Sequence, residues 1–217
     1  MSKVTYFLDG INFKEYGVSV SASKGVINRP KLKNPTSASW DNYHGEVVDL
    51  EHKYYEPREI TLSCFCKAEN KIDFITKTFN FQRLFDKKGT QRLMIDFGNT
   101  QLVYEVYCKD AIEITKKWND STMVGTFDLK LIEPEPIKKV LKYKRTNEAS
   151  KRCSITLNSS KLVNIYWGDG STDFDVEGSI TRTHDYLANG TYHIIITGDI
   201  DTITNFSSNA EVLWNKL

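Results

Sequence analysis

Three aspartates lie close together in the stretch IYWGDGSTDFD. Asp169, Asp173 and Asp175 could supply oxygen ligands for calcium, or paired carboxylates for acid–base chemistry with His184 as a partner. The spacing argues against an EF-hand loop, which needs carboxylates at positions 1, 3 and 5 and a glutamate at position 12. Here the intervals are four and two, Ile180 occupies position 12, and nothing in the sequence brings His184 near the aspartates.

The same stretch also has the pattern of a tight turn. Gly168, Asp169 and Gly170 follow a strand whose Tyr166 or Trp167 would enter a core. The Asp169 side chain can accept backbone N–H groups within its own turn, as in an Asx turn. We favour this interpretation over metal binding and over catalysis.

The remaining reactive side chains predict no catalytic, cofactor or metal site. Cys64 and Cys66 are two residues apart and share one strand face, and no further ligand pair for zinc lies nearby. We interpret all four cysteines as buried thiols in a reducing compartment: Cys64, Cys66, Cys108 and Cys153. His44 and His52 flank GEVVDLE, where they are interpreted as solvated loop ends. The chain contains no G-x-S-x-G, H-E-x-x-H or Walker motif.

The composition limits the classes of partner. The 217 residues include 29 basic and 28 acidic side chains, so the overall charge gives no reason to expect nucleic acid or an anionic membrane. Residues 1–145 carry 24 basic and 19 acidic residues and the remainder 5 and 9, which suggests two units of different character. No stretch is apolar enough for a membrane span or a secretory signal, so we expect synthesis in the cytoplasm.

Alternation of apolar and polar residues is the main structural signal. In EPREITLSCFCKA, every second residue from Ile60 to Cys66 is apolar, and similar runs recur towards residue 131. This pattern predicts antiparallel sheets with one solvated face. One helix is expected over about residues 71–86, because Ile72, Ile75 and Phe79 have helical spacing and Asn70 can cap the start.

A boundary is expected near Pro134 and Pro136, which cannot lie in a central strand. We predict a domain over 1–135, a linker over 136–151 and a second domain over 152–217. The basic run KVLKYKR within the linker could contact nucleic acid, although a solvated linker is favoured. Short strands separated by turns predict a small β-sandwich beyond it, with Asn189-Gly190 as the strongest hairpin signal.

The second domain resembles the polycystic-kidney-disease-like (PKD-like) β-sandwich repeat. The similarity lies in YWGDGST, THDY and NGTYHIIITG, over about residues 153–200. It implies that Trp167 and Tyr186 are core aromatics and that Trp167, Gly168, Asp169 and Gly170 form the marker turn. It also implies that Gly190 and Tyr192 start the late strand.

The first domain resembles the N-terminal domain of phage distal tail proteins. The order of elements carries this resemblance over about residues 3–133, together with the phrases YFLDGINF, GEVVDL, REITLSCFC and GTQRLMIDF. It implies an antiparallel β-sandwich or barrel with one helix that closes into six-subunit rings. It also implies a second domain on the outside of the ring, lectin-like in many relatives.

A segment from Asn28 to Gly45 lacks clear periodicity and contains Pro30, Pro35, Trp40 and Tyr43. A loop of this length inside a compact domain is usually functional. Aromatic side chains suit an interface, because one end of the ring can be buried while the other end stays in contact with water. We therefore favour an interface with a neighbouring subunit or the tail tube, with an ordinary packed loop and a ligand-binding loop as alternatives.

These observations predict a two-domain, mainly β, non-enzymatic virion protein without cofactor or metal. It would form a homo-oligomeric ring, hexameric by the resemblance, that joins the tail tube to tail-tip proteins of a phage or prophage. The second domain would be a spacer or contact a host-surface glycan. The alternative is a bacterial surface or carbohydrate-binding module with a PKD-like spacer. A hydrolase would lack a nucleophile–base pair.

Overall fold

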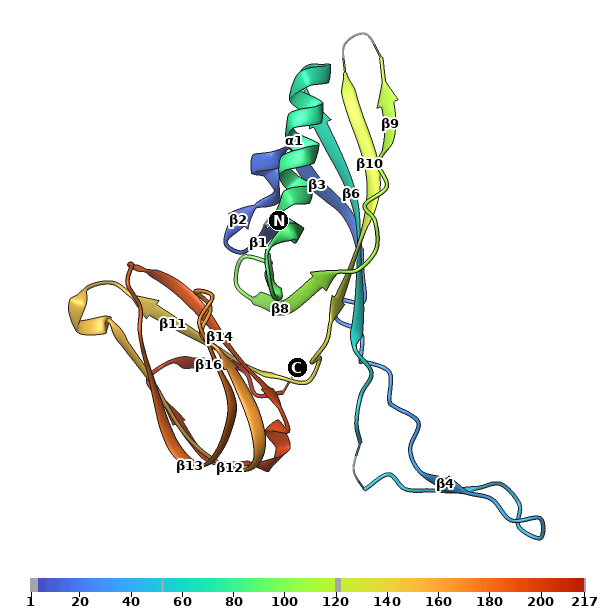
Figure 1. Ribbon diagram of the computed structural model, residues 1–217, viewed down its shortest axis with the longest axis vertical. Helices are drawn as coiled ribbons and strands as arrows, with labels where there is room; N and C mark the ends of the chain where they lie inside the picture. The colour runs from blue at the N-terminus through green and yellow to red at the C-terminus, as the bar shows by residue number, and fades with distance from the viewer. Residues whose placement is uncertain (1–3, 52, 120–121, 217) are drawn as a thin grey trace. The chain divides into compact units, whose positions relative to one another are not determined.

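The computed structural model describes residues 4–51, 53–119 and 122–216. The chain divides into two compact units, Met1–Pro134 and Glu135–Leu217, and each is described here by itself. Both are mainly β (Figure 1). The prediction of antiparallel sheets with one helix is confirmed.

The described residues of the first unit form one α-helix and a large antiparallel sheet. Its strand order is β2-β1-β7-β8-β10-β6-β3, with β9 paired to β10, and β4 and β5 form a separate two-stranded sheet. The strands are β1 (Thr5–Leu8), β2 (Ile11–Asn12), β3 (Val18–Lys24), β4 (Ser37–Ala38), β5 (Val47–Val48), β6 (Arg58–Ala68), β7 (Gln91–Asp96), β8 (Gln101–Cys108), β9 (Thr115–Trp118) and β10 (Met123–Glu133). The helices are the 3-10 turns η1 (Phe13–Tyr16) and η2 (Leu84–Asp86) and the α-helix α1 (Lys71–Arg83).

Strands β6 and β10 form the centre of this unit. They pair along eleven residues, from Met123 opposite Ala68 to Glu133 opposite Arg58. Alternate residues of β6 from Arg58 to Ala68 are buried, as the period of two predicts, while Glu59 and Lys67 are exposed. The sheet therefore has one face in the core and one face in solvent.

The helix begins and ends close to the predicted positions, but it buries a different face. The Asn70 side chain accepts the Asp73 N–H at 2.9 Å, as expected of an N-cap. The buried residues are Phe74, Thr78 and Phe81, whereas the stripe of Ile72, Ile75 and Phe79 is exposed. Both stripes contain large apolar residues at helical spacing, so periodicity alone did not decide between them.

Close packing explains which face was chosen. The Phe81 ring lies against Phe13, with centroids 5.1 Å apart. Gly125 of β10 lets Phe74 approach, since a Cβ there would lie 2.5 Å from the Phe74 ring. The two large aromatic rings therefore fill the space above the sheet, and the isoleucine stripe faces outward.

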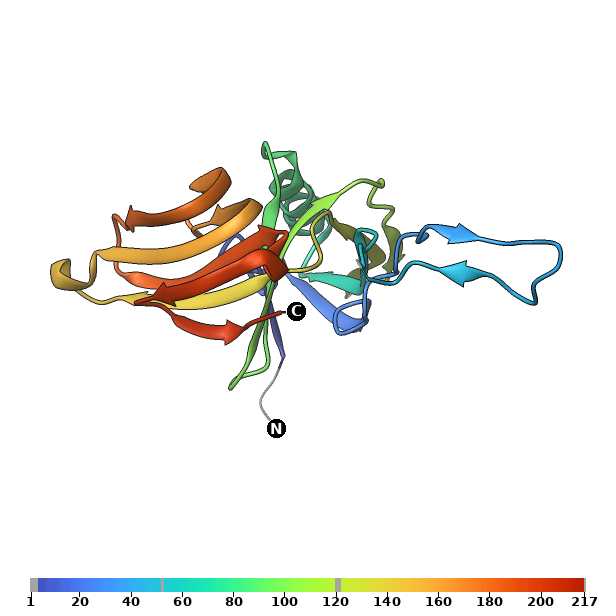
Figure 2. The ribbon, with the colours of Figure 1, turned by 90° about the horizontal axis from the view of Figure 1, so that it is seen from below.

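The second unit is built from one bent sheet, of order β13-β12-β14-β11-β16 with β15 also paired to β12 (Figure 2). Its strands are β11 (Lys139–Arg145), β12 (Arg152–Tyr166), β13 (Thr172–Asp185), β14 (Gly190–Gly198), β15 (Ile203–Ser208) and β16 (Glu211–Trp214), with 3-10 turns η3 (Glu148–Ser150) and η4 (Ile200–Thr202). The first half of β12 pairs with β15 and its second half with β14. The bend folds the sheet over a core of aliphatic and aromatic side chains.

Two expectations for this region were wrong. The predicted linker 136–151 contains strand β11, which pairs with β14 along seven residues. Val140, Leu141 and Tyr143 are buried, so the basic run is a strand whose lysines lie between buried side chains. Asn189-Gly190 does not close a hairpin, because β13 pairs with β12 while β14 pairs with β11 and β12.

Candidate assembly surfaces

The segment expected to be an irregular loop is part of a β-hairpin arm, defined here as residues 28–57 (Figure 1). Only β4 and β5 form a regular ladder, in which Ser37 pairs with Val48 and Ala38 with Val47. Isolated backbone bonds continue the hairpin: Asp49 N–H to Thr36 O (2.9 Å), Lys33 N–H to Tyr54 O (2.9 Å) and Glu56 N–H to Lys31 O (2.7 Å). Because the pairing is short and is interrupted by Pro30 and Pro35, the sequence of the arm shows no regular alternation of apolar and polar residues.

The root of the arm is held by a buried polar network. Nη1 of Arg58 donates to the carbonyl oxygens of Val26 and Asn28, each at 3.1 Å. Its Nε lies 2.9 Å from Oε2 of Glu133, and both side chains are at most 5% exposed. The Tyr104 hydroxyl also donates to Val26 O at 2.8 Å, and burial raises the pKa of that phenol. The root is thus fixed to the sheet.

A glycine allows the chain to leave β3 at this point. Gly25 has φ of +86°, and a Cβ there would lie 2.0 Å from the carbonyl oxygen of Glu59. A left-handed backbone in so tight a space requires glycine. Sequence patterns did not mark Gly25, Arg58 or Glu133 as structural residues. An isolated charged residue in a strand is usually solvated, so Arg58 and Glu133 were not expected to be buried.

The outer part of the arm exposes its aromatic residues. Trp40 is 53% and Tyr43 57% exposed, and their rings meet edge to face with centroids 6.2 Å apart. The other predicted interface residues, Pro30 and Pro35, are half-buried. Further exposed apolar surface comes from Val47, Leu50 and Tyr54. A segment with this much exposed apolar surface is more often a binding site than a simple solvated loop.

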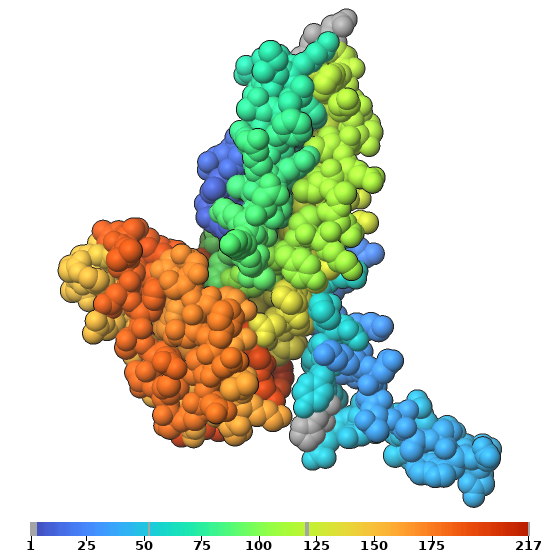
Figure 3. Space-filling view, viewed as in Figure 1, coloured from blue at the N-terminus to red at the C-terminus, as the bar shows by residue number. Residues whose placement is uncertain are grey.

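A second apolar surface lies on the helix. A groove of about 300 Å³ runs between α1 and the segment 112–118, and is here called the helix groove. Figure 3 shows these two segments on the surface of the first unit. The groove is lined by Phe74, Ile75, Thr78, Phe79, Gln82, Ile112, Ile114, Lys116 and Trp118. The helix stripe beside it, with Ile72 78% and Phe79 57% exposed, has the composition of a buried face.

The three aspartates of the opening stretch do not converge. Asp169 Oδ1 accepts the Ser171 N–H at 3.0 Å, which closes an Asx turn over residues 169–171, with Gly168 and Gly170 at positive φ. Asp173 Oδ2 lies 3.3 Å from the Trp167 indole nitrogen. Across the described residues, no group of three or more histidine, cysteine or acidic side chains is placed to hold a metal ion.

His184 does reach the turn, contrary to expectation. Its Nε2 lies 2.7 Å from Asp169 Oδ2, and its ring stacks on Trp167 with centroids 5.1 Å apart. Burial disfavours the charged form of Asp169, but the hydrogen bonds from His184 and the Ser171 N–H outweigh it, so the pKa of Asp169 is lowered. Tyr186 donates from its hydroxyl to Trp167 O at 2.8 Å, and both residues are buried. These contacts fasten the turn to the core.

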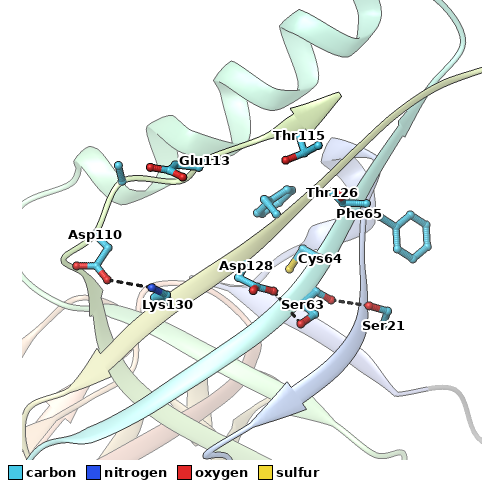
Figure 4. Close-up of a pocket in the computed structure, with 12 residues that line it drawn as sticks. Ser21, Ser63, Cys64, Phe65, Asp110, Glu113, Thr115, Thr126, Asp128 and Lys130 are labelled. Carbon is cyan, nitrogen blue, oxygen red and sulfur yellow. Dashed lines mark hydrogen bonds and ion pairs between the residues drawn. The ribbon is translucent and has the colours of Figure 1, made fainter. Parts of the chain in front are cut away.

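A polar hollow of about 640 Å³ lies on the sheet of the first unit (Figure 4). Strand β10 pairs with β9 at its start and with β8 only at Leu131 and Ile132, which leaves an opening between them. Ser63 donates to Asp128 at 2.8 Å, and Lys130 lies 3.8 Å from Asp110. Among the described residues that line the hollow there is no histidine.

Burial favours the protonated form of the cysteine thiols. Burial, with a contribution from the Asp128 charge, raises the pKa of Cys64 to about 12, and burial raises that of Cys153 to about 11. Protonated thiols are poor nucleophiles and poor metal ligands. Cys64, Cys66 and Cys153 are buried as predicted, whereas Cys108 is half-exposed. His44 is exposed, and His52 lies outside the described residues.

The comparisons with known proteins give similarities to solved structures. No protein-family model and no curated protein matches the chain. The Dit protein of phage SPP1, described as a paradigm of the hub adsorption apparatus in phages infecting Gram-positive bacteria, is similar with a TM-score of 0.48. That match has 12% identity over 88% of this chain and 78% of that chain.

A chain of the phage p2 baseplate, solved in its activated conformation with Sr, is similar with a TM-score of 0.44. The identity is 8%, over 90% of this chain and 98% of that chain. At TM-scores below 0.5 and identities this low, the two likenesses carry no inference about fold or binding. No helix among the described residues is long and apolar enough to cross a membrane.

Proposed function

We propose that this chain is a structural protein of a phage or prophage tail tip. In this proposal it assembles into a homo-oligomeric ring, with six subunits as the expected number, that joins the tail tube to tip proteins. The chain acts by fitting against other copies and not by catalysis. It becomes part of the virion after synthesis in the bacterial cytoplasm.

The observation that carries the proposal is the pair of apolar surfaces on the first unit. A ring requires a heterologous interface, in which one surface of each subunit meets a different surface of the next. The arm exposes Trp40 and Tyr43, and the helix groove exposes Ile75 and Phe79. Exposed aromatic side chains of this kind are typical of the few residues that dominate the binding energy of a protein interface.

The sheet of the first unit also ends in strands suited to pairing. Strand β3 is the last strand in the order, and its residues Ser21–Lys24 are exposed. Edge strands have free backbone groups that another chain can satisfy. The register shift between Val20 and Ala22 limits this pairing to a short stretch.

We further propose that the second unit is a PKD-like sandwich that serves as a spacer or a weak contact with a host-surface glycan. The buried Trp167 and Tyr186 and the turn at Gly168–Gly170 are what this assignment would require. The Asp169–His184 contact ties that turn to the core, which gives it a structural part in the proposal.

Shortening the arm is expected to abolish assembly. Asp49 N–H already donates to Thr36 O at 2.9 Å, so residues 37–48 can be replaced by Asn-Gly, which suits a two-residue hairpin turn. The variant retains the root and loses Trp40, Tyr43 and Val47. Sedimentation velocity should show monomers, because the exposed anchors of the interface are gone.

The control for this experiment is Phe174→Ser, which removes an exposed aromatic side chain from the second unit. It should assemble as the unaltered chain does. Equal assembly of the arm-shortened variant would contradict the role of the arm. Binding of the intact monomer to a glycan array, without self-assembly, would favour a bacterial surface or carbohydrate-binding module instead.

A further inference from the structure

We propose that the outer part of the arm of one subunit binds in the helix groove of the next subunit. This inference rests on the proposed ring and assigns its two complementary surfaces. The occupant of the groove is a second copy of this chain, and the contact is apolar at its centre and ionic at its border.

The groove has the properties of a receiving site. Its floor is formed by the apolar side chains between α1 and the segment 112–118. Lys116 is the one charged residue among the described side chains that line it. Lys71 and Arg83 are exposed on the same helix. Lys71 precedes Ile75 by four residues and Arg83 follows Phe79 by four, so a positive charge lies at each end of the apolar stripe.

The arm has the opposite charge at its outer end. Residues 34–51 contain four acidic residues, Asp41, Glu46, Asp49 and Glu51, and no lysine or arginine. All four are exposed, as are Trp40 and Tyr43 beside them. An acidic segment with aromatic anchors therefore matches an apolar groove with a basic border, and such complementarity fixes partner and register.

The geometry of the first unit favours a contact between copies over a contact within one chain. The arm is rooted at Arg58 and Glu133, at one end of the paired strands β6 and β10. The groove lies towards the other end, where Phe74 and Ile114 lie over Gly125 and Trp118 packs against Phe74. Eight residues of strand β10 separate Glu133 from Gly125, which corresponds to roughly 26 Å. A surface at each end of a subunit is the arrangement that head-to-tail assembly requires.

Cysteine cross-linking between two differently labelled chains tests this contact. One chain carries Asn42→Cys in the arm and the other Gln82→Cys in the groove, both with Cys108→Ser. The remaining thiols are buried and protonated, so a short bismaleimide reagent reports only the new cysteines. We expect a cross-linked heterodimer in the mixture and none from either chain alone.

Variants of the groove chain then test which residues form the site. Phe79→Ser should lower the cross-linked yield at least fivefold, whereas Leu162→Ser, at a similarly exposed position in the second unit, should leave it unchanged. Lys116→Glu should lower it about two- to fivefold, as expected for an exposed ion pair. Asp41→Lys in the arm chain should restore that loss.

The outcomes separate this contact from the ring itself. Closed oligomers without a cross-link would overturn the contact and leave the ring standing. Cross-linked pairs without closed oligomers would support the contact and overturn the ring. A cross-link within one chain that carries both cysteines, diluted into excess unsubstituted chain, would show that the arm occupies its own groove. That result, or full yield with Phe79→Ser, would overturn the inference.

Discussion

Replacing Glu133 with leucine is expected to destabilise the first unit by about 3–5 kcal/mol. Glu133 is 1% exposed and lies 2.9 Å from the Arg58 guanidinium, which is itself 5% exposed. Without the carboxylate, the buried positive charge of Arg58 loses its Glu133 counter-charge, and that penalty exceeds the value of the pair itself. We expect the two compact units to unfold separately, so the measurement is the transition of the first unit in differential scanning calorimetry.

The double variant Arg58→Met with Glu133→Leu provides the matched control. It removes both charges, so it should lose less stability than the sum of the two single variants. It should not recover fully, because the carbonyl groups of Val26 and Asn28 lose their donor. Additive losses would show that Arg58 and Glu133 act independently, and that the arm is not fixed by their pairing.

Replacing Trp167 with alanine is expected to destabilise the second unit by about 3–5 kcal/mol, the usual cost of removing a large core aromatic residue. The Trp167 ring is 1% exposed and stacks on His184, and its carbonyl accepts from Tyr186. Calorimetry should show a fall of roughly 10 °C or more in the transition of the second unit. The transition of the first unit should not move.

Phe174→Ala is the control for the second unit, since that side chain is 62% exposed. Its effect should stay within about 0.5 kcal/mol, as for most surface substitutions. If Trp167→Ala lowered both transitions equally, the two units would share one cooperative core. The proposed division near Pro134 would then be wrong.

The strands and the helix of the first unit follow from the sequence because their signals are local. Alternation from Ile60 to Cys66 marks β6, and Asn70 caps α1 where predicted. The orientation of the helix does not follow, because two apolar stripes compete. The choice depends on Phe13 and Gly125, which lie far from the helix in sequence.

The contact between Asp169 and His184 shows why the candidate site in the second unit could not be found from spacing. In the β12–β13 ladder, Tyr166 pairs with Thr172 and Cys153 with His184, so the turn and His184 belong to opposite ends of a long hairpin. Register shifts between Ser159 and Ile165 mark irregularities along β12. The bent hairpin brings its ends together, which is a property of the whole sheet.

The arm was recognised for its composition but not for its structure. Trp40 and Tyr43 pointed to an interface, whereas the hairpin has a regular ladder of only two residue pairs. The aromatic composition of this surface could be read from the sequence. The strand pairing that presents it could not, because it depends on a distant root at Arg58.

The central claim is that these two surfaces assemble copies of the chain into a closed ring. The most direct test is the mass of the full chain in solution, measured by light scattering over a range of concentrations and accompanied by negative-stain imaging. We expect one discrete species at six times the 25.0 kDa subunit mass, with a ring-shaped outline. A mass of 25.0 kDa at every concentration, or a continuous series of open oligomers, would contradict the claim.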